Sequence, residues 1–151
     1  MTGSTSTTAR DLRTRLFRIG AWCFVVVGLA HLLVQLTALA GSRPATVQRV
    51  LDVMAHTSTS LLVLDRSLGQ LFYGFSVTMA LSVLGYGILN LVVASRAHHL
   101  VAEGRLVPAM NLALSALALV VSVLAFPEPP IAALAVATAA FAATLLVRPA
   151  A

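Results

Sequence analysis

The residues with the clearest capacity for chemistry are polar side chains that interrupt long apolar stretches of the sequence. His31 and Gln35 lie four residues apart within residues 19–40, so in a helix they share one face. Tyr and Cys side chains aside, His31 is the only ionisable group deep inside such a stretch. Because an ionisable side chain is costly to place in lipid, one inside a membrane span is a candidate functional group.

Further polar residues occur at a matching depth in the next apolar stretch, residues 68–95. If the two stretches form antiparallel helices, a rise of about 1.5 Å per residue brings Tyr73 and Ser76 level with His31, with Gln70 close by. In a catalytic site, His31 would act as a general base or acid and Tyr73 would polarise an oxygen of the substrate. A purely structural alternative is a neutral His31 that is hydrogen-bonded to a serine or tyrosine of the next helix.

The pocket expected around His31 would suit a lipophilic small molecule, such as a prenyl, quinone, sterol or polyketide-like compound, which is bound, isomerised or cyclised. The residues expected to contact this ligand come from the apolar stretches and from the connection between them: Gln35, Gln70, Ser76, Asp52, His56 and Asp65. No metal is expected, because the histidines lack the clustered ligands of a metal site. No cofactor is expected either, since the sequence has no phosphate-binding loop, dinucleotide fingerprint or haem-attachment motif.

The composition indicates the surroundings in which these residues are positioned. Of the 151 residues, 59% are hydrophobic and only 10% are charged, whereas soluble domains carry about 25% charged residues. This balance excludes an ordinary soluble enzyme and makes the lipid bilayer the expected partner of the surface. Four apolar stretches are long enough to cross a bilayer, and they cover residues 19–40, 68–95, 107–126 and 131–147.

We therefore predict an all-α polytopic membrane protein, with a single bundle of four transmembrane helices over residues 12–148. Residues 1–11 lack an apolar period and are predicted to form a disordered cytoplasmic tail. Residues 45–56 are predicted to form an amphipathic helix on the outer membrane face, because apolar residues recur there at helical spacing.

The arginines indicate how this bundle is oriented. With the N-terminus inside, seven of the ten arginines lie on the cytoplasmic side and three on the opposite side. Both termini are therefore predicted to lie in the cytoplasm, with the helices in the cell membrane. A pI near 11.1 would otherwise suggest nucleic-acid binding. Because the arginines are explained by membrane topology, no nucleic-acid partner is expected.

Residues 19–40 admit a second interpretation, as a secretory signal cleaved after Ala38-Leu39-Ala40. The apolar stretch is longer than the roughly 7–15 residues of a signal core. It also carries His31 and Gln35, which a disposable segment does not need. These two features favour a retained membrane span.

The alternative function is non-enzymatic, either a membrane subunit or a component of an oligomeric transporter. Ala135, Ala139 and Ala143 recur every four residues in the last apolar stretch. Such small-residue seams let helices approach closely, so they offer a surface for a homo-oligomer.

Two segments resemble parts of small, uncharacterised four-helix bacterial membrane proteins: Gly28-Leu29-Ala30-His31-Leu32 and Gly69-Gln70-Leu71-Phe72-Tyr73-Gly74-Phe75-Ser76. The general plan, with a long first outer connection and a short last hairpin, is similar to that of DoxX-like proteins. The resemblance implies the four-helix architecture and supplies no activity. In those relatives an acidic residue often accompanies the aromatic run of the second helix, whereas Gln70 occupies that neighbourhood here.

Overall fold

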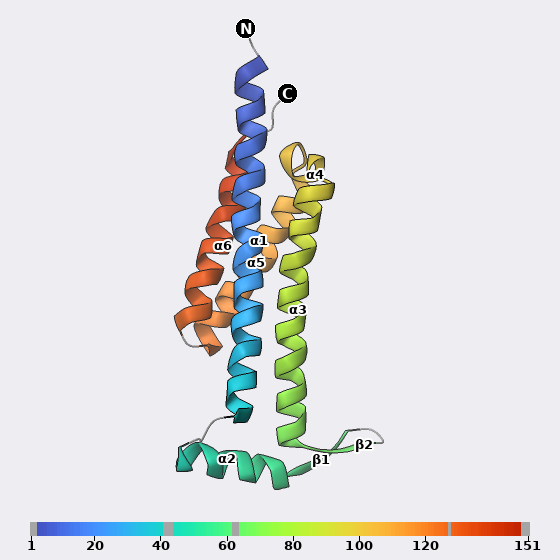
Figure 1. The fold of residues 1–151 in the computed structure, drawn as a ribbon, viewed down its shortest axis with the longest axis vertical. Helices are drawn as coiled ribbons and strands as arrows, with labels where there is room; N and C mark the ends of the chain where they lie inside the picture. Colours follow the sequence, from blue (N-terminus) through green and yellow to red (C-terminus); the bar gives the residue numbers. More distant parts are fainter. Residues whose placement is uncertain (1–2, 41–43, 62–63, 127, 149–151) are drawn as a thin grey trace. The chain divides into compact units, whose positions relative to one another are not determined.

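The computed structural model describes residues 3–40, 44–61, 64–126 and 128–148. Within these residues the chain forms six helices and one short β-hairpin (Figure 1). Four of the helices are long and apolar enough to cross a membrane, namely α1 (Gly3–Ala40), α3 (Leu68–Arg96), α5 (Leu106–Ala125) and α6 (Glu128–Leu146). The two shorter helices are α2 (Ala45–His56) and α4 (His99–Ala102). The mainly helical class and the four long apolar helices predicted from the sequence are confirmed.

The chain divides into two compact units. One unit comprises residues 1–27 and 83–151, and the other comprises residues 28–82. Helices α1 and α3 each contribute residues to both units.

The core of the first unit is built from aromatic rings of α1, α3 and α6. Phe17 and Phe141 are fully buried and meet edge to face, with ring centroids 5.2 Å apart. Phe24 meets Tyr86 in the same edge-to-face manner at 5.0 Å. Aromatic pairs prefer this arrangement because the positive edge of one ring faces the negative face of the other.

Helices α5 and α6 pack against each other within the first unit (Figure 1). Helix α5 turns small and polar residues inward, so that Asn111, Ser115 and Ser122 are buried. Asn111 Nδ2 donates to Val107 O at 2.9 Å, and Ser115 Oγ donates to Leu112 O at 3.0 Å. Tyr86 of α3 donates its hydroxyl to Asn111 Oδ1 at 2.7 Å. By contrast with the small residues of α5, two alanines of the predicted α6 seam, Ala135 and Ala139, are exposed.

Helix α1 begins earlier than the sequence indicates. Residues 1–11 are predicted to be a disordered tail, yet α1 already begins at Gly3, and residues 1–2 lie outside the described residues. The tail prediction is therefore wrong from Gly3 onward. Two arginines explain the extension, because Arg10 forms an ion pair with Glu103 at 3.5 Å and Arg13 is fully buried. These contacts hold the start of the helix against the rest of the first unit.

The second unit contains α2 and a hairpin that the all-α prediction does not include. Helix α2 follows the predicted bounds of residues 45–56 and buries none of its residues. Strands β1 (Ser58–Leu61) and β2 (Leu64–Ser67) then pair antiparallel, with Ser58 opposite Ser67. A further hydrogen bond from Leu68 N to Thr57 O, 2.9 Å long, closes the base of the hairpin where α3 begins.

Candidate functional site

Three polar side chains of the second unit meet at one hydroxyl group. His31 Nε2 lies 2.9 Å from Ser76 Oγ. Gln35 Nε2 donates a hydrogen bond to the same Ser76 oxygen. All three side chains are half-buried, and they come from α1 and α3, two of the helices that are apolar enough to span a membrane. We call this group the His31 cluster (His31, Gln35 and Ser76).

The hydrogen-bond geometry admits two tautomers of the His31 imidazole. Ser76 Oγ accepts a hydrogen from Gln35 and keeps a second lone pair and its own hydroxyl hydrogen. His31 Nε2 therefore either accepts the Ser76 hydrogen, with the imidazole proton at Nδ1, or donates its own hydrogen to Ser76 Oγ. In the first tautomer, His31 places a proton acceptor directly on the Ser76 hydroxyl.

Two atoms of the His31 cluster are left for an external partner. Among the described residues, neither His31 Nδ1 nor Gln35 Oε1 has a recorded hydrogen bond. Both atoms are accessible from outside the chain, because no side-chain nitrogen or oxygen atom of the described residues is buried without a hydrogen-bond partner. In the tautomer that carries its proton at Nδ1, the cluster offers one N–H donor and one carbonyl acceptor to a ligand that bears a hydroxyl or carbonyl group.

The structure records no hydrogen bond between the His31 cluster and either Gln70 or Tyr73 within the described residues, so their predicted roles at the site stay predictions. Gln70 forms a capping box with Ser67: Ser67 N donates to Gln70 Oε1, and Gln70 N donates to Ser67 Oγ, both at 3.2 Å. Gln70 precedes Ser76 by six residues, so it lies about 120° away around a helix with about 100° per residue. Its side chain serves the start of α3 and does not join the His31 cluster.

Tyr73 lies closer to the Ser76 face but does not bond to the cluster. Its side chain is 42% exposed, and no hydrogen bond of its hydroxyl is recorded within the described ranges. Three residues correspond to about 300° of helical rotation, which leaves Tyr73 about 60° from Ser76. The structure thus brings together three of the predicted inner residues and leaves Tyr73 beside them.

The residues predicted to contact the ligand from the connection between the first two apolar stretches, Asp52, His56 and Asp65, are all exposed. His56 Nδ1 lies 2.7 Å from the backbone oxygen of Asp52, one turn earlier in α2. The Asp52 carboxylate accepts a hydrogen bond from Gln48 at 3.1 Å. Asp65 lies in β2 opposite Ser60. No contact of these three residues with the His31 cluster is recorded in the described structure, so their predicted role as ligand-binding residues stays a prediction.

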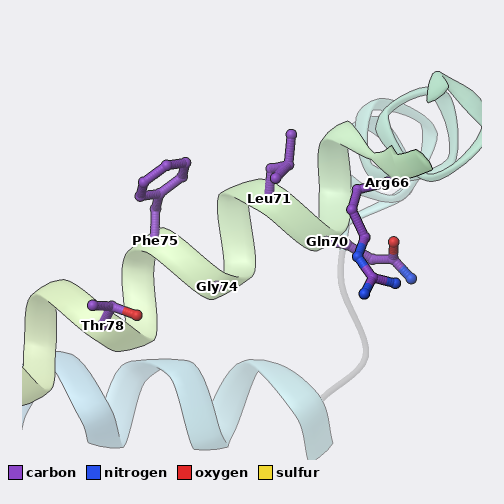
Figure 2. Close-up of a pocket in the computed structure, with 6 residues that line it drawn as sticks. All are labelled: Arg66, Gln70, Leu71, Gly74, Phe75 and Thr78. Carbon is purple, nitrogen blue, oxygen red and sulfur yellow. The ribbon is translucent and has the colours of Figure 1, made fainter. Parts of the chain in front are cut away.

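An open groove runs along a different face of α3. Its volume is about 510 Å³, and it is lined by Arg66, Gln70, Leu71, Gly74, Phe75 and Thr78. Figure 2 shows Leu71 and Phe75 projecting from the same side of α3, with Gly74 between them and the polar ends of Arg66 and Gln70 at one end. Ser76 is not among the lining residues, because it lies on the opposite side of the helix from this stripe.

Arg13, the largest fully buried side chain in the described residues, is not among the functional residues predicted from the sequence. The guanidinium donates to three backbone oxygens: Nε to Val101 at 3.1 Å, Nη1 to Val147 at 2.5 Å and Nη2 to Gly104 at 2.7 Å. These carbonyls lie in or just after α4 and just after α6, where helix ends leave carbonyls without intrahelical partners. Arg13 thus joins α1 to two helix ends of the first unit.

A sequence signal for Arg13 was present. Arg13 precedes Phe17, Ala21 and Phe24 at intervals of three to four residues, which places all four on one stripe of a helix. All four are buried. An arginine that continues an apolar stripe indicates a buried, hydrogen-bonded role more strongly than a role in topology alone.

No match to this chain is found among protein-family models, curated proteins or solved structures. The similarity to DoxX-like proteins therefore stays a prediction, and the function must be argued from the residues themselves.

Proposed function

We propose that this chain is a multi-pass protein of the cell membrane with both termini in the cytoplasm. Four helices of sufficient length and apolarity support the insertion, and the uneven distribution of arginine supports the orientation. Resistance to alkaline carbonate extraction would support insertion. In a Cys23→Ser background, Arg49→Cys should react with an impermeant maleimide in intact cells, and Arg148→Cys should react only after permeabilisation. The reverse pattern would contradict the orientation.

Within that membrane protein, the His31 cluster is proposed to bind the polar group of a lipophilic small molecule. The single observation that carries this proposal is the convergence of His31 and Gln35 on Ser76 Oγ. Apolar helix surface lies beside the cluster, since Val34, about 60° from His31 around α1, is 61% exposed and Phe72, about 40° from Ser76 around α3, is 60% exposed. A ligand with an apolar body and one hydroxyl or carbonyl group matches both parts of this surface.

The same geometry would also support chemistry on a bound ligand. His31 Nε2 is within hydrogen-bond distance of the Ser76 hydroxyl, which is the reach that a general base requires. In the tautomer protonated at Nδ1, the ligand would give a proton to Ser76 Oγ as the Ser76 hydroxyl proton passes to Nε2, and Nδ1 would return its proton to a second site of the ligand. Ser76 and His31 would then carry the same number of protons as before the transfer. Isomerisation or cyclisation of a prenyl or quinone compound needs such proton transfer and no cofactor.

The binding proposal is tested with the purified full-length protein in detergent. Farnesol and a short-chain prenylated quinone are the probes, one with a hydroxyl group and the other with carbonyl groups. We expect either probe to raise the Tm of the native protein, and His31→Ala and Ser76→Ala to abolish that increase. Ser82→Ala is the matched control, because Ser82 is an exposed serine of the same helix. An unchanged increase in His31→Ala would contradict the proposal.

A second candidate function, a homo-oligomeric membrane subunit, is favoured by the outward face of α6. Ala135 and Ala139 are exposed on α6, whereas Leu134 and Ala137 face inward. In this case Ala139→Leu should shift the protein to a smaller species in light scattering, and His31→Ala should not. Ala113→Leu is the control, since Ala113 is an exposed alanine of α5. A native protein that is monomeric in detergent and in nanodiscs would contradict this function.

A further inference from the structure

A polar cleft of the first unit lies where α1 enters its apolar stretch. The cleft has a volume of about 380 Å³ and is lined by Asp11, Thr14, Arg15, Arg18, Ala94, Ser95 and His98. The α1 residues recur at intervals of three to four, so they form one face of that helix. The opposite wall is the last turn of α3 and the turn that follows it.

We propose that this cleft, which we call the headgroup cleft, binds the phosphate of an anionic phospholipid with a hydroxyl-bearing headgroup such as phosphoglycerol. This inference rests on the proposed membrane insertion and is independent of the His31 cluster. Arg15 and Arg18 supply the positive charge for the phosphate. His98 adds a ring N–H that can donate a hydrogen bond to its oxygens. The hydroxyls of Thr14 and Ser95 line the cleft but donate within their own helices, to Arg10 O at 3.1 Å and to Val92 O at 2.9 Å.

Arg15 and Arg18 differ from Arg10 and Arg13, whose guanidinium groups already bind other parts of the chain. Arg10 pairs with Glu103, and Arg13 is buried among backbone carbonyls. Arg15 and Arg18 are exposed, and within the described ranges neither forms an ion pair. Two guanidinium groups one turn apart are therefore available to an anion from outside the chain.

Apolar surface next to the headgroup cleft favours a lipid over a soluble phosphate compound. Trp22 continues the cleft-lining face of α1 one turn beyond Arg18 and is 55% exposed. Val26 follows at 56% exposed, and Ile88 of α3 is 49% exposed. Trp is enriched at the membrane–water interface, where its ring spans the apolar and polar regions. A phosphate held by the two arginines would direct its acyl chains along this apolar surface.

Asp11 indicates which anionic headgroup fits. Along α1 it lies farther from the apolar stretch than Arg15 and Arg18, so it would face the part of the headgroup beyond the phosphate. A carboxylate accepts hydrogen bonds from hydroxyl groups and repels a second anion. The arrangement thus suits phosphatidylglycerol better than a headgroup with additional negative charge.

The test measures binding of short-chain phosphatidylglycerol to the full-length protein in detergent by native mass spectrometry. We expect the Arg15→Gln/Arg18→Gln double variant to bind at least tenfold more weakly than the native protein. The control is Arg49→Gln/Arg148→Gln, which removes the same charge from exposed positions outside the cleft and should change binding less than twofold. Equal weakening in both double variants, or no binding by the native protein, would overturn the proposal.

Two further probes identify the source of the anion and the part of the surface involved. Short-chain phosphatidylcholine should bind at least tenfold more weakly than phosphatidylglycerol, and binding of equal strength would overturn the proposal. Glycerol 3-phosphate that binds as tightly as the lipid would show a soluble ligand and overturn the lipid assignment. Ser95→Leu, which fills the cleft without changing charge, should also weaken phosphatidylglycerol binding.

The outcomes separate this inference from the proposed function. A protein extracted by alkaline carbonate would refute membrane insertion and the headgroup cleft together. If the inserted protein binds phosphatidylglycerol equally well with and without Arg15 and Arg18, only the headgroup cleft is refuted. Loss of the farnesol effect in His31→Ala, with phosphatidylglycerol binding intact, would support both sites as separate features.

Discussion

Gly87 of α3 lies directly against the backbone of Val25 in α1. A Cβ atom added at Gly87 would come within 2.7 Å of Val25 N and 3.0 Å of Ala21 O. Backbone atoms cannot move aside as a flexible side chain can, so only glycine permits this approach of the two helices. Small residues at helix contacts play this role in membrane proteins generally.

The first prediction concerns this contact. Gly87→Ala should lower the free energy of unfolding in detergent by about 1–3 kcal/mol, because the added methyl group overpacks the interface. Gly85→Ala is the matched control. Apart from the neighbouring residues and nearby backbone of its own helix, no described atom lies within 4 Å of a Cβ atom added at Gly85. Gly85→Ala should raise stability by about 0.5–1 kcal/mol, because alanine favours a helix over glycine. Equal effects of both substitutions would contradict the close approach.

The second prediction tests Arg13 as a connector of helix ends. Arg13→Lys keeps the charge but cannot place donors on three separate carbonyls, which the guanidinium reaches through three nitrogen atoms. The loss of one or two charge-assisted bonds should lower the free energy of unfolding by about 2–4 kcal/mol. Thermal unfolding in detergent measures this effect, with Arg49→Lys on the exposed face of α2 as the control. If both variants unfold at the native Tm, the three bonds contribute nothing to stability.

Some features of this molecule are predictable from the sequence because they depend only on hydropathy and on the rise per residue within single helices. Hydropathy over about twenty residues identifies the four apolar helices. Rise per residue brings Ser76 level with His31, and their 2.9 Å contact confirms that depth. Depth along the helix does not predict that Gln70 bonds to Ser67, because that contact depends on the local geometry at the start of α3.

Other features depend on partners that are distant in the chain. Arg13 bonds to carbonyls 88 and 134 residues away, and neither helix end is marked by a residue type that would indicate an arginine partner. The β-hairpin at residues 58–67 is similarly obscure, since its short Ser- and Thr-containing strands lack the hydrophobic alternation of a half-buried strand. By contrast, the pair Ser67 and Gln70 matches the capping-box pattern and was predictable as a helix start.

The third prediction follows from that capping box. Ser67→Ala should cost about 1 kcal/mol of stability, because a capping side chain is lost at the start of α3. Amide hydrogen exchange in the first turn of α3 should accelerate in both Ser67→Ala and Gln70→Ala. Gln48→Ala, on exposed α2, should leave that turn unchanged.

The effect of farnesol on the Tm tests the alternative that Gln70 contacts the ligand instead of capping α3. If Gln70→Ala abolishes the effect of farnesol on the Tm while exchange in α3 stays native, Gln70 contacts the ligand and is not primarily a cap. The capping assignment expects the reverse result, because Gln70 bonds to Ser67 and does not join the His31 cluster.

The fourth prediction measures the His31–Ser76 interaction without any ligand. A double-mutant cycle with His31→Ala and Ser76→Ala should give a coupling free energy of about 1 kcal/mol, typical of a neutral hydrogen bond. His31→Ala combined with Ser82→Ala should be additive, because no interaction between those two residues is recorded among the described residues. A coupling near zero for His31 and Ser76 would show that the pair does not form. The proposed proton transfer through His31 depends on that hydrogen bond, so it would then be lost as well.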